Sequence, residues 1–174
     1  MRRSFVPVIA VLTLVLSLVA ASPARAGGGP EKVFAGKILT SDKKFPTYAK
    51  SAGAYTAALR KQSKNQFWED KAKQTWKIYF AAFFKKGLTD IEVVVKLYDV
   101  TNGQKNLMAS FEQYVDQRGQ TALLSQFTLE RKLVGVNKQV LMIIEVGGRS
   151  VASGKFKILG QEERLTGKVD FSED

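Results

Sequence analysis

The sequence predicts a mainly β fold, an antiparallel β-sandwich with one short helix near residues 51–62. After residue 74, apolar and polar residues alternate in several short segments, a pattern that places one face of a strand on a core and the other near water. Turn-forming glycine and asparagine residues separate these segments, which is typical of tight connections between neighbouring antiparallel strands. An open β-barrel is the alternative, because its strands carry the same alternation.

Eight segments carry a strand pattern, and turn residues separate them. The first expected strand is Val33–Leu39, well before the others. The remaining strands are expected near residues 75–84, 90–99, 106–115, 121–133, 138–146, 149–158 and 165–171. This strand count resembles that of immunoglobulin-like or C2-like sandwiches, and no motif of a named family accompanies it.

The expected helix begins at a serine that can cap it. Ser51 precedes Tyr55, Ala58 and Leu59, which follow one another at helical spacing in an alanine-rich segment. Gly53 lowers the helix propensity of the first turn. We expect one short helix that covers an edge of the sandwich.

The segment 75–84 is the most apolar part of the expected sheet, and both of its faces are apolar. This pattern predicts a strand that is buried on two sides, and the alternative is a strand whose outer face meets a partner. Trp76 shares a face with the buried positions of this strand, so we predict a core anchor. Trp68 stands beside two acidic residues outside the strand pattern, so we predict that it is the more exposed indole.

The N-terminus has the features of a signal peptide. Two arginines precede an apolar run, and Ala24-Arg25-Ala26 offers the small residues that a signal peptidase accepts, so residues 1–26 are expected to be cleaved. The alternative, a transmembrane anchor, needs a longer apolar run. The mature chain would have a flexible start at 27–31 and one domain at 32–174, with no stable membrane span. Export to a bacterial periplasm or to the exterior is expected, by general secretion or by a twin-arginine route.

The composition excludes several classes of chemistry. The 174 residues contain no cysteine and no histidine, which excludes disulfides, thiolate nucleophiles, cysteine-based zinc sites and imidazole acid–base catalysis. Phosphate-loop, dinucleotide-binding and calcium-loop motifs do not occur in the sequence. We therefore expect no cofactor and no metal site.

Positive charge is concentrated in residues 37–77, which contain ten basic residues, three acidic residues and several aromatic residues. A basic and aromatic segment can bind an anionic ligand such as a glycan or a lipid head group. The candidate ligand-binding residues are Lys43, Lys44, Lys50, Arg60, Lys61 and Lys64. The alternative is a solvated surface that keeps the protein soluble, which nine lysines among the ten cations favour. Nucleic acid is an unlikely partner for an exported chain, whereas an envelope component or another protein fits.

Catalytic signals are weak. Ser41-Asp42-Lys43-Lys44 matches the S-x-x-K pattern of serine acyl-enzymes, but the S-D-N and K-T-G elements of those enzymes are missing. The carboxylates on the expected strands do not form an obvious facing pair for glycoside hydrolysis. We assign no catalytic residue and expect a non-enzymatic interaction or structural module, with a small carboxylate- or Ser/Lys-based hydrolase as the rival hypothesis.

Overall fold

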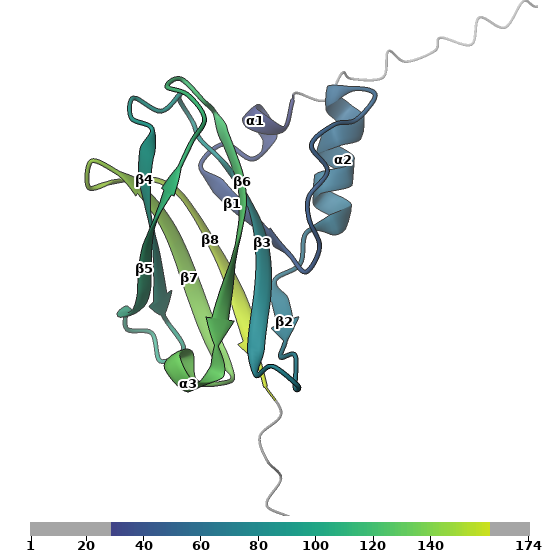
Figure 1. The fold of residues 1–174 in the computed structure, drawn as a ribbon. Coiled ribbons are helices and arrows are strands. Elements are labelled where there is room, and N and C mark those ends of the chain that lie inside the picture. Colours follow the sequence, from purple (N-terminus) through teal and green to yellow (C-terminus); the bar gives the residue numbers. More distant parts are fainter. Residues whose placement is uncertain (1–28, 161–174) are drawn as a thin grey trace, which may run out of the picture.

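The structure is a computed structural model and describes residues 29–160 (Figure 1). The expected signal peptide and the expected strand 165–171 lie outside the described residues. In chain order the elements are α1 (Pro30–Val33), β1 (Lys37–Ser41), α2 (Ala52–Gln62), β2 (Gln66–Trp68), β3 (Thr75–Phe83), β4 (Glu92–Asp99), β5 (Asn106–Tyr114), β6 (Ala122–Glu130), α3 (Arg131–Val134), β7 (Lys138–Val146) and β8 (Arg149–Leu159).

The strands form one curled sheet with the shape of a half-barrel (Figure 1). Its order is β5-β4-β7-β8-β1-β3-β6, and β2 also pairs with β8. The predicted two-sheet sandwich is not confirmed, whereas the open-barrel alternative is consistent with this sheet. Two parallel pairings, β1 with β8 and β2 with β8, join the two groups of antiparallel strands into one sheet. The alternation in the sequence shows which face of a strand is buried, but it does not show which strands are neighbours.

β1 and β2 both pair with β8, one after the other along its length. β1 meets β8 at Ser153, and β2 continues along β8 from Lys157 to Leu159. Between them the chain leaves the sheet at residue 42 and returns at residue 65; we call residues 42–65 the excursion. Its base is closed by Thr40 and Lys64, because the Lys64 N–H donates to the Thr40 carbonyl (2.7 Å) and the Thr40 hydroxyl donates to the Lys64 carbonyl (2.6 Å).

The inside of the half-barrel is filled by large apolar side chains from all the long strands. Trp76 on β3 is 1% exposed, and its Nε1–H donates to the Leu159 carbonyl at the end of β8 (3.0 Å). Phe127 of β6 contacts the rings of Phe80, Phe111 and Phe156. These contacts bring the two edge strands, β5 and β6, together through side chains. The prediction that Trp76 is a core anchor is confirmed, as is the exposure of Trp68 (69%).

A second, smaller core covers the outer face of β3. Phe45 and Leu59 of the excursion pack in one cluster with Ala81 and Phe83 of β3, and Phe34 completes it. This arrangement explains why both faces of β3 are apolar: one face lines the half-barrel and the other lies under the excursion. Burial on two sides is therefore confirmed for residues 80–83, whereas Lys77 on the outer face of the same strand is exposed.

Three local predictions are corrected by the structure. The first strand begins at Lys37 rather than at residue 33, because Pro30 starts α1 and Gly36, with φ of +73°, turns the chain into β1. Residues 27 and 28 of the expected flexible start lie outside the described residues. The strand expected over 121–133 ends at Glu130, opposite the first residue of β3, and α3 follows. β2 was not predicted, because three residues are too few to show a period.

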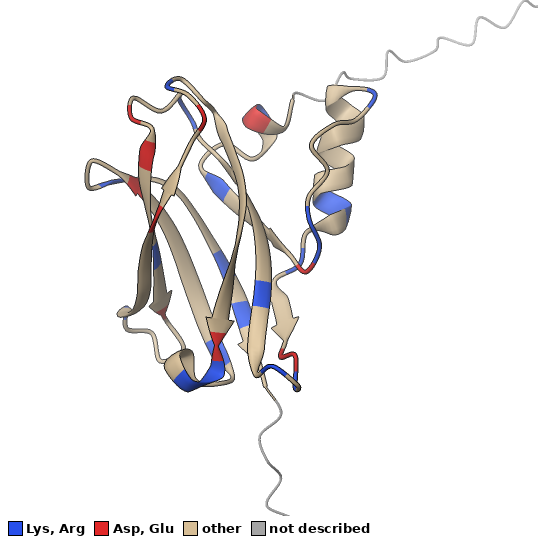
Figure 2. Ribbon diagram, in the orientation of Figure 1, with Lys and Arg blue, Asp and Glu red and all other residues tan. Residues whose placement is uncertain are grey.

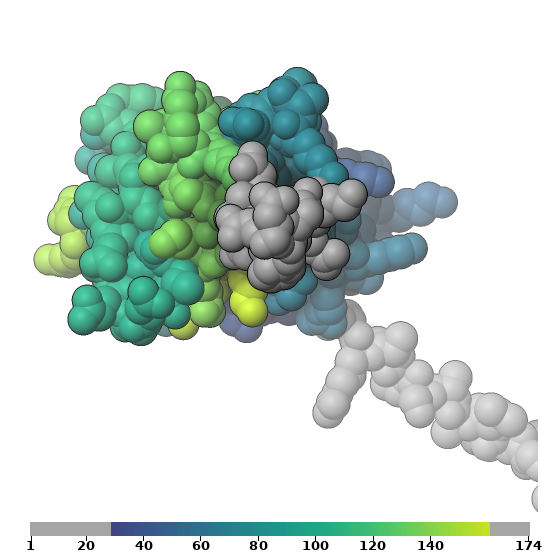
Figure 3. Space-filling view, turned by 90° about the horizontal axis from the view of Figure 1, so that it is seen from below, coloured from purple at the N-terminus to yellow at the C-terminus, as the bar shows by residue number. Residues whose placement is uncertain are grey.

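The other elements agree with the sequence analysis. α2 spans Ala52–Gln62, and the Ser51 hydroxyl accepts a hydrogen bond from the Ala54 N–H (3.1 Å), as a capping residue should. Gly147 and Gly148 both have positive φ and form the tight connection between β7 and β8. At the opposite end of the sheet, shown in Figure 3, the loops after β4 and before β7 lie side by side, and Lys138 and Asp99 form an ion pair there (2.8 Å).

Candidate functional site

All six candidate residues lie in the excursion, where Figure 2 shows the basic positions in blue along the ribbon. All six are exposed. Lys43 and Lys44 follow β1, Lys50 precedes α2, and the others lie in or just after the last turn of α2. Asp42 is the only acidic residue of the excursion. The excursion therefore contains most of the charge excess that the sequence analysis found in residues 37–77.

The C-terminal end of α2 brings several of these cations together. The Gln62 side-chain amide donates to the carbonyls of Lys43 (2.9 Å) and Lys44 (2.7 Å), which fixes that segment against the end of the helix. Lys61 precedes this glutamine in the chain, whereas Lys50 lies at the other end of α2, about 16 Å away along an 11-residue helix. The structure thus groups most of the predicted site and separates Lys50 from it.

Few of these cations have an ionic partner. Lys64 forms an ion pair with Asp42 (2.6 Å), and its ammonium group holds the pKa of the Asp42 carboxyl below its usual value through this hydrogen bond. The Arg60 guanidinium lies 5.9 Å from the centre of the Phe34 ring, within the range of a cation–π contact. The remaining four cations form no ion pair with another described residue. Their charge is therefore available to a ligand.

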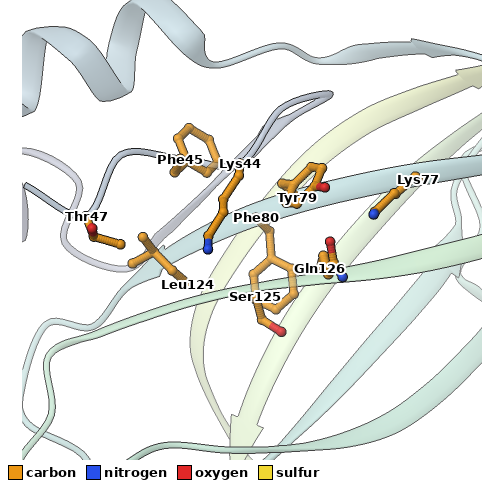
Figure 4. Close-up of a pocket in the computed structure, with 9 residues that line it drawn as sticks. All are labelled: Lys44, Phe45, Thr47, Lys77, Tyr79, Phe80, Leu124, Ser125 and Gln126. Carbon is orange, nitrogen blue, oxygen red and sulfur yellow. The ribbon is translucent and has the colours of Figure 1, made fainter.

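A cavity of about 550 Å³ lies between the excursion and the outer face of the sheet (Figure 4). Its lining comes from Lys44, Phe45 and Thr47 of the excursion, Lys77, Tyr79 and Phe80 of β3, and residues 124–126 of β6. Of the six predicted residues, only Lys44 lines it, and Figure 4 shows its side chain reaching from the excursion toward β6.

The second cation of the cavity, Lys77, was not selected by sequence reasoning. Its Nζ lies 5.2 Å from the centre of the Tyr79 ring, two residues along β3. The signal was present in the sequence, because Lys77 and Tyr79 alternate with the buried residues of this strand and must share its outer face. Two ammonium groups beside aromatic side chains form a site that can hold an anionic group on a partly apolar ligand.

The features considered for catalysis have structural roles instead. Ser41, the serine of the S-x-x-K match, is fully buried, and its hydroxyl accepts a hydrogen bond from the Lys43 N–H (3.0 Å), which stabilises the turn after β1. Among the strand carboxylates, Glu145 pairs with Lys96 (2.7 Å) and Asp99 pairs with Lys138. The pKa of Asp99 is lowered to about 2, mainly because Lys138 and Thr101 donate hydrogen bonds to its carboxylate.

One buried carboxylate was missed by the sequence analysis. The Glu69 side chain is only 5% exposed, its Oε2 lies 3.6 Å from the Arg131 guanidinium, and its Oε1 has no hydrogen-bond partner within residues 29–160. Glu69 follows the exposed Trp68, and the sequence around it does not predict burial. Within residues 29–160, the acidic side chains do not gather into a group of three or more that could hold a metal ion.

The helices of the described chain are all too short or too polar to cross a membrane. A comparison with models of known protein families finds no family that matches this chain, and a comparison with curated proteins finds no similar sequence. The function must therefore be inferred from the residues of the site.

Proposed function

We propose that this protein is an exported, non-enzymatic binding module that holds an anionic ligand against the excursion. The observation that carries the proposal is the combination of cations that have no ionic partner among the described residues and a cavity that one of them, Lys44, lines. On the sheet, by contrast, several cations are neutralised by neighbouring acids, such as Lys96 by Glu145. An unneutralised group of cations attracts anions over a distance comparable to the Debye length.

The proposed binding is non-covalent. The exposed lysines attract the ligand, and the cavity then takes one of its anionic groups between Lys44 and Lys77. The apolar floor, formed in part by Phe45 and Tyr79, lowers the local dielectric and strengthens the contact. The base of the excursion is held by the hydrogen bonds between Thr40 and Lys64, so the site is formed before the ligand arrives.

The test replaces three candidate cations that lie outside the cavity and have no ion pair: Lys43→Gln, Lys50→Gln and Lys61→Gln together. A matched control replaces Lys85, Lys105 and Lys155, which are also exposed lysines without ion pairs but lie outside the excursion. Both variants lose the same net charge. The probes are inorganic polyphosphate in solution and a heparin column at increasing salt.

We expect the native protein to bind both polyanions and to release them as the salt concentration rises, because salt screens exposed charges. The excursion variant should bind at least about fivefold more weakly, and the control variant less than about twofold. Equal losses in the two variants would show a response to net charge alone and would contradict the proposal. Failure of the native protein to bind either polyanion at low salt would also contradict the proposal.

Export is part of the same proposal and has its own test. Ala24 and Ala26 supply the small residues that signal peptidase requires, so the exported protein should begin at Gly27. N-terminal sequencing of the protein from the culture medium or from a periplasmic extract should read Gly-Gly-Gly-Pro. Recovery of a chain that retains residues 1–26 would contradict cleavage.

A further inference from the structure

A second cavity, of about 380 Å³, adjoins the first at the edge of the sheet. The two cavities share Thr47, Leu124 and Ser125, so they form one continuous depression around β6, which we call the β6 groove. β6 is an edge strand, and among the described strands its only neighbour is β3. The groove therefore runs along a free edge of the sheet, where a chain-like ligand can lie.

The two ends of the β6 groove differ in charge. The first cavity is lined by Lys44 and Lys77 and has no acidic residue. The second cavity is lined by Asp116 and has no cation. A ligand that fills both ends should therefore carry negative charge at the first end and none at the second.

The second cavity is rich in tyrosine and glutamine. Tyr55, Tyr114, Gln113 and Gln120 line the second cavity, while Tyr79 and Gln126 line the first. An aromatic ring offers an apolar face and a polar tip, and an amide side chain both donates and accepts hydrogen bonds. A sugar ring has an apolar face and hydroxyl groups on its rim, so it matches this combination of side chains.

Several of these side chains are held in place by other residues. The Ser125 hydroxyl donates to the Gln113 side-chain oxygen (2.6 Å), which links β6 to β5. Gln120 accepts from the Asp116 N–H (3.0 Å), and the Tyr114 hydroxyl donates to the Glu112 carboxylate (3.1 Å). Tyr114 is nevertheless 60% exposed, so it remains accessible to a ligand.

We propose that the β6 groove binds an acidic oligosaccharide, with a carboxylated sugar between Lys44 and Lys77 and neutral sugars against Tyr55 and Tyr114. This inference rests on the proposed function and names its ligand class. A nucleic acid or polyphosphate fits the groove less well, because its evenly spaced phosphates would place negative charge beside Asp116. An acyl chain fits less well because amides and hydroxyls, which would lose their hydrogen bonds to water, line the groove at both ends.

The test measures binding by titration calorimetry on the full mature chain. The probes are an oligogalacturonate of four sugars that carries one free carboxylate at an end sugar and methyl esters on the other three, its complete methyl ester, an oligothymidylate and an extended neutral peptide. We expect saturable binding of the oligogalacturonate and at least about tenfold weaker binding of the ester, which keeps the sugar rings but loses the charge. Tighter binding of the nucleotide or of the peptide than of the oligogalacturonate would overturn the inference.

Two pairs of variants separate the ends of the groove. Lys44→Gln with Lys77→Gln should remove the preference for the acid over its ester, whereas Lys155→Gln with Lys157→Gln on β8 should leave it unchanged. Tyr114→Ala should weaken the binding of the acid and the binding of the ester alike, by about fivefold or more. Tyr48→Ala is the matched control, because this tyrosine is 82% exposed and lines neither cavity. Equal effects of the two tyrosine variants would overturn the inference.

The outcomes also distinguish this inference from the proposed function. Polyphosphate binding that depends on Lys43, Lys50 and Lys61, together with no binding of the oligogalacturonate, would overturn the sugar inference and keep the anion-binding module. Oligogalacturonate binding that is unaffected by those three substitutions, with no polyphosphate binding, would place the ligand in the groove and overturn the wider role of the excursion.

Discussion

The half-barrel and the excursion differ in how many acidic residues accompany their cations. Four of the five ion pairs among the described residues lie outside the excursion, including Lys96 with Glu145 and Lys138 with Asp99. The excursion has six cations, a single acid and one ion pair. Its attachment is apolar instead, through Phe45 and Leu59 against the outer face of β3.

This difference separates the parts of the molecule by role. The half-barrel gains its stability from a large buried core, and the described chain outside the excursion has ten acidic residues beside sixteen basic ones. The excursion packs through a small second core and keeps its charge unbalanced, which costs some stability through like-charge repulsion and suits a ligand-binding surface. Four predictions test this division, from the largest expected effect to the smallest.

Loss of the Trp76 side chain should have the largest effect. Trp76→Ala empties a large site in the half-barrel core and removes the hydrogen bond to the Leu159 carbonyl, so the free energy of unfolding should fall by about 3–5 kcal/mol. Trp68→Ala, at an exposed indole, should change it by less than about 0.5 kcal/mol. Urea unfolding of both variants gives the two values.

The exposure of Trp76 and Trp68 can also be compared in variants that keep an aromatic ring at both positions. In variants that keep one tryptophan and replace the other by phenylalanine, iodide should quench the fluorescence of Trp68 and leave that of Trp76 nearly unchanged. Equal quenching of the two indoles, together with an unchanged stability of Trp76→Ala, would place Trp76 on the surface and return it to the candidates for binding.

Two glycine substitutions compare backbone contacts in the sheet and in the excursion. A Cβ at Gly154 of β8 would lie 2.5 Å from the Ile38 carbonyl oxygen, so Gly154→Ala should destabilise the protein by about 1–3 kcal/mol. A Cβ at Gly53 of α2 would meet nothing within 4 Å, so Gly53→Ala should stabilise the protein by up to about 1 kcal/mol. The change in thermal unfolding should therefore have opposite signs in the two variants, and a shared sign would contradict the close approach of β8 and β1.

Ser51→Ala tests how firmly the excursion is held. Because the Ser51 hydroxyl caps α2, its loss should cost about 1 kcal/mol. Hydrogen exchange should accelerate at the backbone amides of α2 and remain unchanged in β7, since the excursion opens locally while the half-barrel stays closed. Uniform acceleration in both elements would show that they unfold as one unit.

The smallest effect concerns the ion pair between Asp99 and Lys138. Folding lowers the pKa of Asp99 to about 2, so the pair adds stability above the ordinary aspartate pKa of about 4, and this contribution is lost as the pH falls toward 2. Asp99→Asn should therefore be less stable than the native protein at about pH 6, and the difference should disappear near pH 2. A difference that persists at the lower pH would show that Asp99 acts through its neutral hydrogen bonds and not through its charge.

The elements of this fold could be predicted from the sequence better than their arrangement. Alternation located most strands, and Ser51 located the start of α2, because both signals are local. The pairing of β8 with β1 and β2 could not be predicted from the sequence, because it joins residues more than 80 positions apart and produces no periodic pattern. The same limit applies to the site: composition identified the excursion cations, whereas the cavity required β3 and β6 to lie beside Lys44, which only the fold determines.

The position of β8 has a consequence for how the chain is made. β8 is the last described strand in the sequence, yet it lies in the middle of the sheet, and among the described strands it is the one whose backbone pairs both with β7 and with β1. A nascent chain that ends before Arg149 lacks this strand, so the contacts left between the two groups are side-chain contacts, such as that of Phe111 with Phe127. The sheet therefore closes only once β8 has been made, after every other described strand.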